Sequence, residues 1–327
     1  MHILVTGGAG YIGSHTCLNL IDQGHEVTII DDLSTGNIEL IPKKAKFVEC
    51  NINEKKIISN LIKKNKFDAV IHFAAFIQVE ESVKNPNKYF ENNTENSIKF
   101  LETCYENDLA NIIFSSTAAV YGNQSGKTSI FETDPIQPLN PYAESKIKIE
   151  NYLFNNNNLF NFIVLRYFNV AGADPALRSG LISKKSTHLI KILSEVAIGK
   201  RDNITIYGND YDTDDGTAIR DYIHVSDLSN IHLKSLEYLI NTKQSNIFNC
   251  GYGKGYSVKE VVDRVNKITK NGIKFDYGER RPGDADILVS NVTKLNKSIN
   301  WIPKYNDLNV ILETSINWEK ILYDKNI

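Results

Sequence analysis

The chain has few cysteines, and none is placed like a disulfide or metal-binding pair. Cys17, Cys50, Cys104 and Cys250 stand far apart in the 327 residues and form no C-x-x-C motif. We expect four reduced, buried thiols that pack like small apolar side chains. The pattern argues against a disulfide-stapled secreted domain and is typical of a cytoplasmic protein.

Long apolar runs are absent as well. No stretch approaches the ~20 apolar residues that a membrane-spanning helix needs. The first apolar run covers only residues 2–6 and is followed at once by glycines, so the basic and apolar segments of a secretory signal are missing. We therefore expect no membrane association.

An excess of charge of either sign is also missing. Lysine and arginine total 37 against 39 aspartates and glutamates, which gives a net charge of −2. This balance provides no overall attraction for nucleic acid or for an anionic membrane, and we expect neither as a partner.

Metal-binding patterns are lacking too. The aspartates between Asp210 and Asp215 superficially suggest a calcium loop. The sixth place of such a loop, counted from Asp210, needs glycine but holds Asp215, and the twelfth needs glutamate but holds Asp221. No H-E-x-x-H or other zinc spacing occurs. We predict no metal site.

The first half of the sequence alternates short apolar runs with longer segments of helical periodicity, within a composition of 42% hydrophobic and 23% charged residues. Repeated strand–helix–strand units with apolar strands predict a parallel sheet covered by helices on both faces, a doubly wound α/β domain of Rossmann type. The predicted strands are residues 2–6, 26–31, 45–51, 69–73, 111–116 and 162–167, and the predicted helices are 11–23, 54–64, 86–107 and 141–155.

The pattern changes after about residue 170. Strands become sparse, and predicted helices over residues 188–199, 226–239 and 308–323 are separated by polar loops. Ser257 and Glu260 form a capping box, so another helix should begin there. We expect a dinucleotide-binding domain over residues 1–170 and a smaller α+β substrate domain over residues 171–327, with some segments crossing back to the first domain.

The junction of the first strand and helix carries the sequence T-G-G-A-G-Y-I-G over residues 6–13. Gly7, Gly10 and Gly13 allow a tight turn and let a pyrophosphate approach the helix N-terminus, where free amides favour anions. Asp31 ends the second strand, where its carboxylate can accept from adenosine ribose hydroxyls and would repel a 2′-phosphate. No arginine lies in residues 31–36. The motif therefore predicts NAD rather than NADP.

A second constellation lies at the start of a predicted helix, where Tyr142 and Lys146 are four residues apart. This spacing places both side chains on one face of the helix. A nearby ammonium and a cationic nicotinamide favour the phenolate form of a tyrosine, which makes it a better general base. The hydroxyl-rich strand end that finishes at Thr117 precedes the pair, and together they indicate a catalytic acid–base group.

Longer segments resemble the extended short-chain dehydrogenase/reductase family, and within it the 4-epimerases of nucleotide sugars. The resemblance covers essentially the whole chain. The segments that carry it are V-T-G-G-A-G-Y-I-G-S-H over residues 5–15, F-S-S-T-A-A-V-Y-G over 114–122, L-R-Y-F-N over 165–169, and G-N-D-Y with D-D-G-T-A-I-R-D-Y-I-H-V between residues 208 and 225.

The resemblance implies roles for individual residues around the cofactor. Tyr142 matches the base that takes the sugar 4-hydroxyl proton, Lys146 the group that holds the nicotinamide ribose, and Thr117 a hydroxyl, commonly serine, that bridges the sugar O4. The other matching cofactor positions are Gly7, Gly10, Tyr11, Ile12, Gly13, Asp31, Asp32, Leu33, Ser34, Thr35, Gly36, Asn51, Ile52, Phe73, Ala74, Ala75, Phe76, Ile77, Asn92 and Phe168.

Two of these positions depart from the family pattern. Asn51 stands where an aspartate is usual, but its side-chain carbonyl still offers an acceptor to the adenine amino group. Ile77 stands where some members have a lysine, so one ionic contact to the cofactor is missing.

The resemblance also implies a binding site for the nucleotide sugar. Arg220 and Arg281 have a physical logic of their own, because guanidinium groups match diphosphate oxygens. Leu288 matches a pocket wall beside the sugar, where members restricted to glucose can carry tyrosine and more permissive members a smaller side chain. Besides Thr117 and Tyr142, the remaining matching positions are Asn169, His188, Leu189, Thr205, Ile206, Tyr207 and Asp284.

The activity implied is the reversible epimerisation of UDP-glucose and UDP-galactose at C4, through a transient 4-keto sugar and enzyme-bound NADH, in galactose metabolism. Two alternatives remain: a dehydratase or decarboxylase acting on a nucleotide sugar, and a nonenzymatic NAD-sensing module. Related dehydratases carry an Asp-Glu pair after the threonine, whereas Ala118 and Ala119 follow Thr117 here. A sensing module would have no need of the Tyr142/Lys146 pair.

The resemblance further implies a homodimer that pairs through the helices predicted at residues 86–107 and 141–155. Their pattern shows amphipathic helices, and we expect Tyr89, Leu101 and Tyr152 on their outer faces.

Overall fold

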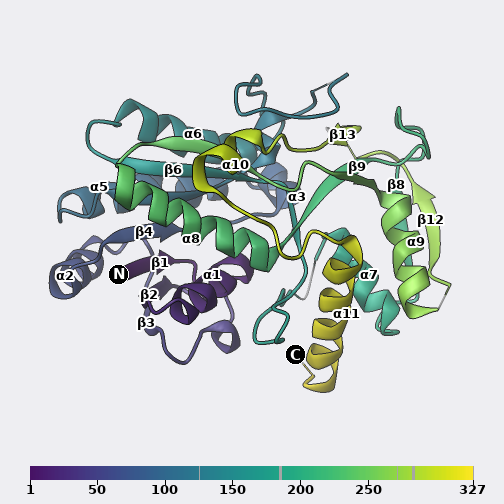
Figure 1. Cartoon of the computed structure of the whole chain (residues 1–327), viewed down its shortest axis with the longest axis horizontal. Helices are drawn as coiled ribbons and strands as arrows, with labels where there is room; N and C mark the ends of the chain where they lie inside the picture. The colour runs from purple at the N-terminus through teal and green to yellow at the C-terminus, as the bar shows by residue number, and fades with distance from the viewer. Residues whose placement is uncertain (125, 184–185, 271, 282–283, 327) are drawn as a thin grey trace.

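A computed structural model describes the whole chain except residues 125, 184–185, 271, 282–283 and 327 (Figure 1). Its largest unit is a parallel seven-stranded sheet with the order β10-β6-β5-β4-β1-β2-β3. The strands are β1 (His2–Thr6), β2 (Glu26–Asp31), β3 (Lys46–Glu49), β4 (Ala69–His72), β5 (Asn111–Thr117), β6 (Asn161–Tyr167) and β10 (Asn246–Cys250).

Both faces of this sheet are buried by helices, because alternate side chains of each apolar strand point to opposite faces. Ile3 and Val5 of β1 pack on one face and Leu4 on the other. One face is covered by α1 (Tyr11–Asp22), α8 (Val225–Thr242) and α10 (Thr293–Ile299), and the other by α2 (Lys55–Asn65), α5 (Asn96–Tyr105) and α6 (Pro141–Asn155). The predicted doubly wound α/β fold is confirmed. All four cysteines are buried and unpaired, as expected.

The second half contains more strands than the sequence predicts. Seven strands, β7 to β13, lie in its described residues, so the expectation of sparse strands is wrong. They are short, and strands such as β8 alternate buried with exposed residues, so they leave no long apolar run in the sequence. Besides β10 they are β7 (Asn169–Ala171), β8 (Asn203–Tyr207), β9 (Ile219–His224), β11 (Gly255–Ser257), β12 (Lys274–Gly278) and β13 (Ile287–Leu288).

These strands form two small sheets with their own apolar core. One sheet has the strand order β11-β9-β13, with β7 also paired to β9, and the other consists of β12 and β8. The core between them is filled from α7 (Leu189–Ala197), α9 (Val258–Thr269) and α11 (Leu308–Asp324). Ser257 caps α9 by accepting from the Glu260 amide at 3.0 Å, so the predicted helix start is confirmed.

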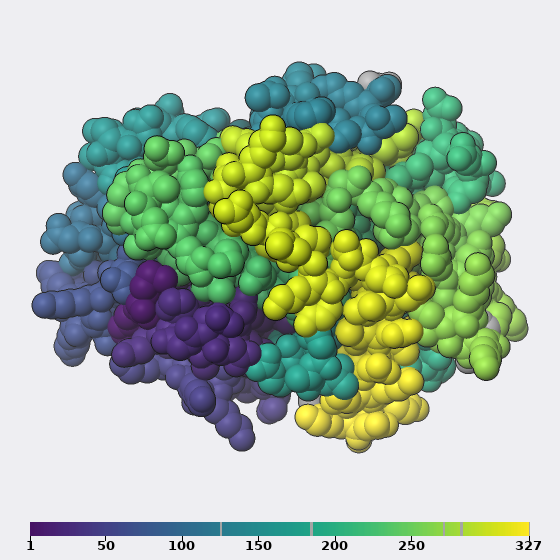
Figure 2. Space-filling model, viewed as in Figure 1, coloured from purple at the N-terminus to yellow at the C-terminus, as the bar shows by residue number. Residues whose placement is uncertain are grey.

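Segments after residue 170 return to the large sheet. Strand β10 pairs with β6, and α8 and α10 cover the sheet face that α1 also covers. In Figure 1 the long helix α8 crosses in front of the large sheet, and Figure 2 shows the C-terminal segment lying over the middle of the same side. The domain boundary at residue 170 remains a prediction. The segments that return to the first domain are β10, α8 and α10.

The helix predicted over residues 86–107 is present from Pro86 to Tyr105, but its middle is π-helical. It divides into α4 (Pro86–Tyr89), a π-helical segment (Phe90–Glu95) and α5, with the short α3 (Val79–Lys84) before it. Tyr89 and Leu101 are fully buried in the chain's own core, so their expected place on an outer face is wrong. The apolar side chains that α5 and α6 expose are Tyr105 and Phe154.

Two 3₁₀ turns, Ile38–Leu40 and Ala118–Tyr121, complete the regular structure of the described residues. No helix in the described part of the chain has both the length and the apolar character needed to cross a membrane.

Candidate active site

The glycine motif forms a tight cradle between β1 and α1. Gly7 has φ +70°, and a side chain there would lie 2.7 Å from the Ala74 amide nitrogen of the neighbouring loop. A Cβ on Gly13 would overlap the Gly7 carbonyl. Helix α1 begins after Gly10 and has no acidic side chain in its first turn, so its amides face an anion-compatible space. This cradle fits the pyrophosphate of a dinucleotide.

Asp31 organises the turn that follows β2. Its carboxylate is 8% exposed and accepts from the amides of Ala9 at 3.0 Å and Leu33 at 2.9 Å. Burial raises the pKa of Asp31, and these two amide bonds oppose the rise. Gly36 lies so close that a Cβ there would be 2.6 Å from Asp31 Oδ1. The turn is therefore built around this carboxylate, in the place where NAD would present its adenosine ribose.

The rest of the predicted adenosine site lies beside this turn. Asn51 donates to Asp32 at 2.6 Å, and both follow the carboxyl ends of neighbouring strands. Ile52 is buried beneath them, and Ser34 and Thr35 are exposed.

The loop after β4 is held by a residue that sequence reasoning missed. The Asn93 side chain accepts from the Phe76 amide at 2.8 Å and donates to the Phe76 carbonyl at 2.9 Å and to Ser145 at 3.1 Å. Asn92, a predicted cofactor residue, donates to Asn93 at 3.0 Å. The π-helical segment presents both asparagines, and a periodicity argument for an α-helix contains no signal for it. Ile77 is 57% exposed at the outer end of this loop.

The predicted acid–base residues come together at the end of β5. Asn140 caps α6 by accepting from the Ala143 amide at 2.9 Å, which fixes the first turn that carries Tyr142. The Tyr142 hydroxyl faces Thr117, whose side chain acts to lower the Tyr142 pKa. Lys146, one turn further along, is 3% exposed and donates to the Ser115 carbonyl at 2.9 Å.

Burial dominates the electrostatics of this group. It raises the pKa of Tyr142 to about 12, and the Thr117 side chain acts in the opposite direction. It lowers the pKa of Lys146 to about 7, against the attraction of Glu150. The expected lowering of the Tyr142 pKa by Lys146 is not seen in the protein alone, because the Lys146 ammonium is directed to the Ser115 carbonyl.

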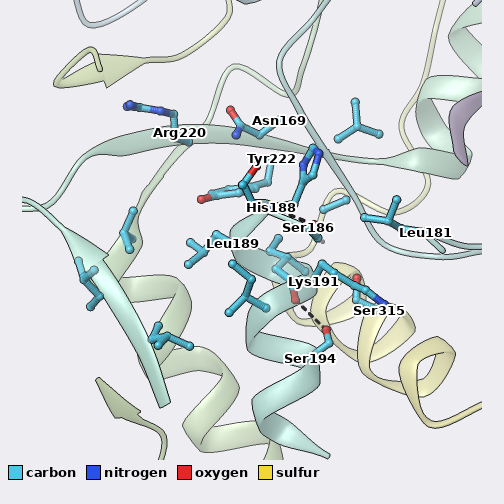
Figure 3. Close-up of a pocket in the computed structure, with 18 of the residues that line it drawn as sticks. Asn169, Leu181, Ser186, His188, Leu189, Lys191, Ser194, Arg220, Tyr222 and Ser315 are labelled. Atoms are coloured by element: carbon cyan, nitrogen blue, oxygen red, sulfur yellow. Dashed lines mark hydrogen bonds between the residues drawn. The ribbon is translucent and has the colours of Figure 1, made fainter. Parts of the chain in front are cut away.

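A pocket of about 520 Å³ opens beside the cradle. Nine predicted sugar-nucleotide residues line it: Asn169, His188, Leu189, Thr205, Ile206, Tyr207, Arg220, Arg281 and Asp284. In Figure 3, Asn169, Arg220 and Tyr222 lie on strands on one side, while His188, Leu189 and Lys191 come from the start of α7. Tyr11 reaches the pocket from the glycine motif and donates to the Gly172 carbonyl at 2.6 Å.

The two arginines of the pocket are oriented by neighbouring side chains. Arg220 is 8% exposed and pairs with Asp284 at 2.5 Å. Arg281 is exposed and its guanidinium lies 4.2 Å from the ring centre of Tyr207. Two guanidinium groups at one pocket suit a diphosphate.

Leu288 joins the pocket to the acid–base group. It is the register partner of Arg220 in the β13–β9 pair. Its side chain packs against the cluster that contains Ala118 and Phe168, next to Thr117. Leu288, Thr117 and Tyr142 do not line the pocket itself.

Some pocket residues were not predicted. Tyr222, Gly172, Lys191 and Ser315 line it, and Lys191 is 6% exposed. Tyr222 lies in the segment that resembles the family, so that motif could have indicated it, whereas Ser315 lies on the closing helix, where the sequence shows only helical periodicity. Within the described residues, no group of three or more histidine, cysteine, aspartate or glutamate side chains could hold a metal ion.

Known proteins share this architecture over the full chain. A UDP-glucose 4-epimerase of Azospirillum brasilense is 42% identical over 322 residues, which cover 98% of this chain and 92% of that protein. The structure of a UDP-glucose-4-epimerase from Stenotrophomonas maltophila, with bound NAD and formylated UDP-arabinopyranose, is 32% identical, with a TM-score of 0.96 and 99% of both chains covered.

A third relative is described for two sugars. The UDP-Glc/GlcNAc 4-epimerase from Campylobacter jejuni is 44% identical, with a TM-score of 0.85, and the match covers 98% of this chain and 99% of that one. The profile of the NAD dependent epimerase/dehydratase family matches residues 3–251, from β1 to the end of β10. With its glycine cradle, its Tyr142/Lys146 pair and its UDP-glucose 4-epimerase relatives, this chain belongs to the NAD dependent epimerase/dehydratase family.

Proposed function

We propose that this chain is an NAD-dependent isomerase that interconverts UDP-glucose and UDP-galactose at C4. The observation that carries the proposal is that the chain combines the buried Tyr142/Lys146 pair beside β5 with a glycine cradle and a pocket lined by two arginines. Full-length similarity to UDP-glucose 4-epimerases supports the choice of substrate.

In this mechanism Tyr142 takes the proton from the sugar 4-hydroxyl and later returns it, while Thr117 holds the oxygen. When bound, NAD supplies a hydride acceptor and donor at C4 and a cationic ring that favours the Tyr142 phenolate. Lys146 holds the nicotinamide ribose from the face of α6 that also carries Tyr142.

The pocket residues hold the nucleotide while the sugar changes orientation. Arg220 and Arg281 bind the diphosphate, and His188, Leu189 and residues 205–207 hold the uridine. The 4-keto sugar turns about its diphosphate link and presents its other face to the same pair of residues. Because the hydride that leaves C4 would return to C4, the reaction needs no net oxidant or reductant.

A lyase reaction fits these residues less well. A dehydratase needs an acid beside the bridging hydroxyl, and Ala118 and Ala119 follow Thr117 at the start of the 3₁₀ turn. Ala118 is 3% exposed and packs in an apolar cluster with Phe168. No proton donor is supplied from these two positions.

The proposal is tested by incubating the purified protein with UDP-galactose and measuring UDP-glucose by chromatography, without added cofactor. We expect conversion, and acid extraction should release NAD at about one molecule per chain. A protein that carries only NADP, or that carries NAD but leaves UDP-galactose unchanged, would be a different member of the family.

We also propose a cytoplasmic homodimer that pairs through α4–α5 and α6. Tyr105 and Phe154 give these helices exposed apolar side chains, 44% and 39% accessible in the single chain. The four buried, unpaired cysteines agree with a reducing compartment.

A further inference from the structure

A buried charged network lies directly below the Tyr142/Lys146 pair, and the mechanism above does not use it. Glu150 is 2% and Arg166 4% exposed. Arg166 Nη2 lies 2.5 Å from Glu150 Oε2, and Arg166 Nε donates to Glu150 Oε1 at 3.1 Å. The carboxylate and the guanidinium thus meet in a two-point contact with fixed geometry.

The same carboxylate connects three elements of the site. Ser116 donates to Glu150 Oε1 at 2.5 Å, and Ser116 immediately precedes Thr117 on β5. Arg166 is the register partner of Ser116 in the β5–β6 pair. Glu150 lies one turn after Lys146 and two turns after Tyr142, so these three residues share one face of α6. The turn that carries Lys146 and the strand end that carries Thr117 are therefore held by one side chain.

The network is complete on its far side as well. Arg166 donates to the Tyr121 hydroxyl at 2.9 Å and to the Glu132 carbonyl at 3.4 Å, and Tyr121 donates to Asn249 at 2.7 Å. Buried ion pairs are poor sources of stability, since apolar residues of similar volume often serve as well. Stability alone therefore does not explain why a charged Glu150–Arg166 pair occupies this place.

The charge of Glu150 acts on Lys146. Around Lys146 lie Tyr142 and Glu150 on its own helix, the Ser115 carbonyl on β5 and His72 on β4. Burial lowers the pKa of His72 to about 3, so this imidazole stays neutral. Burial likewise lowers the pKa of Lys146 to about 7, and Glu150 is the group that raises it.

We propose that Glu150 is a positioning residue for the reaction: held by Arg166 and Ser116, it fixes Lys146 and Thr117 relative to each other and places a negative charge one helical turn from Lys146. This inference rests on the roles proposed above for Tyr142 and Lys146. Conversion of UDP-galactose by the wild-type protein tests those roles, and the variants below test Glu150.

The experiment compares Glu150→Gln with Arg166→Gln in the NAD-loaded protein. Both variants break the ion pair, but only Glu150→Gln removes the negative charge next to Lys146. Turnover is followed against pH, and the NAD that each chain retains after gel filtration is measured at several pH values. Melting temperatures report the structural cost of each change.

Glu150→Gln should move the alkaline limb of turnover to lower pH by about one unit, the low end of the effect of a nearby opposite charge. The sign follows because Lys146 loses its proton earlier when the carboxylate charge is gone. NAD retention should fall over the same pH range. Arg166→Gln should lower the melting temperature as much as Glu150→Gln does. It should not move the pH curve of turnover or that of NAD retention to lower pH.

Equal pH curves for the two variants, with equal losses of melting temperature, would show that the network is only structural. If Glu150→Gln does not fold, because Arg166 is left unpaired, the double variant Glu150→Gln/Arg166→Gln removes both buried charges. It should fold and show the same downward shift of both curves. A folded double variant with wild-type curves would overturn the proposal.

Discussion

At the scale of single residues, the proposed chemistry depends on three side chains that come from two elements. Thr117 ends β5, and Tyr142 and Lys146 share one face of α6. In the protein alone, burial disfavours the phenolate form of Tyr142, since it raises the pKa of this side chain to about 12. Tyr142 is therefore protonated in the protein alone.

Tyr142→Phe should reduce turnover about 10²–10⁴-fold, the range for a single general acid–base group. The ring remains, so the UDP affinity measured by calorimetry should stay close to the wild-type value. Tyr323→Phe is the matched control, because Tyr323 is 57% exposed on the closing helix. Wild-type turnover in Tyr142→Phe would remove this residue from the mechanism.

Leu288 should set the range of sugars. Leu288 pairs with Arg220 in the strand register, and its side chain packs against the cluster beside Thr117. It lacks a ring that would occupy the space of an N-acetyl group. We expect measurable but weaker activity on UDP-N-acetylglucosamine than on UDP-glucose.

Leu288→Tyr should then lower activity on the N-acetyl sugar about 10–200-fold, equal to ~1–3 kcal/mol of steric discrimination, with a smaller effect on UDP-glucose. Parallel assays of both substrates in wild type and variant give the ratio. Full N-acetyl activity in the tyrosine variant would show that Leu288 is not the gate.

At the scale of elements, the shape of the pocket depends on how α7 is held against α11. Lys191 forms an ion pair with Glu319 and lies 3.7 Å from Glu195. All three side chains are at most 6% exposed. The pair therefore fixes the helix whose first residues, His188 and Leu189, border the pocket.

Lys191→Ala should lower the free energy of unfolding, because Glu195 and Glu319 lose a buried partner, but by less than the roughly 3–5 kcal/mol of a buried charge left alone, since Arg201 and Lys200 still pair with them. Chemical denaturation measures this change. Lys84→Ala, which breaks the exposed Lys84–Glu80 pair on α3, should leave stability almost unchanged. Similar losses for both variants would contradict the assigned role of the buried pair.

The elements that the sequence predicts well are those with a strong period or motif. The apolar runs 2–6 and 26–31 form β1 and β2, and α9 begins at the capping box of Ser257. The π-helical segment and the short strands after residue 170 could not be predicted, since tertiary contacts rather than local pattern define them. The roles of Asn93 and Glu150 could not be predicted either, because their hydrogen-bond partners lie far away in the sequence.

At the scale of the whole molecule, the second half completes the sheet of the first. Strand β10 and helix α8 return to the large sheet, so neither half carries its whole core alone. Tyr11 and Gly172 join the glycine motif to the pocket through one hydrogen bond. The glycine cradle and the pocket are thus parts of one packed body.

The proposed homodimer can be tested at this scale by light scattering. We expect twice the 36.9 kDa mass of the chain at micromolar concentration. Tyr105→Glu on α5 should shift the protein toward monomer, because it places a charge in an apolar contact, whereas Tyr323→Glu should not. A stable 36.9 kDa species in the wild type would refute the dimer.

The most direct measurement of the central claim follows the hydrogen at C4. UDP-glucose deuterated at C4 is converted in ordinary water, without added cofactor, and the product is examined by NMR. Transient oxidation within one closed site predicts UDP-galactose that keeps its deuterium at C4, since the hydrogen leaves and returns without meeting solvent. Product with protium at C4, or no product from NAD-loaded protein, would contradict the account.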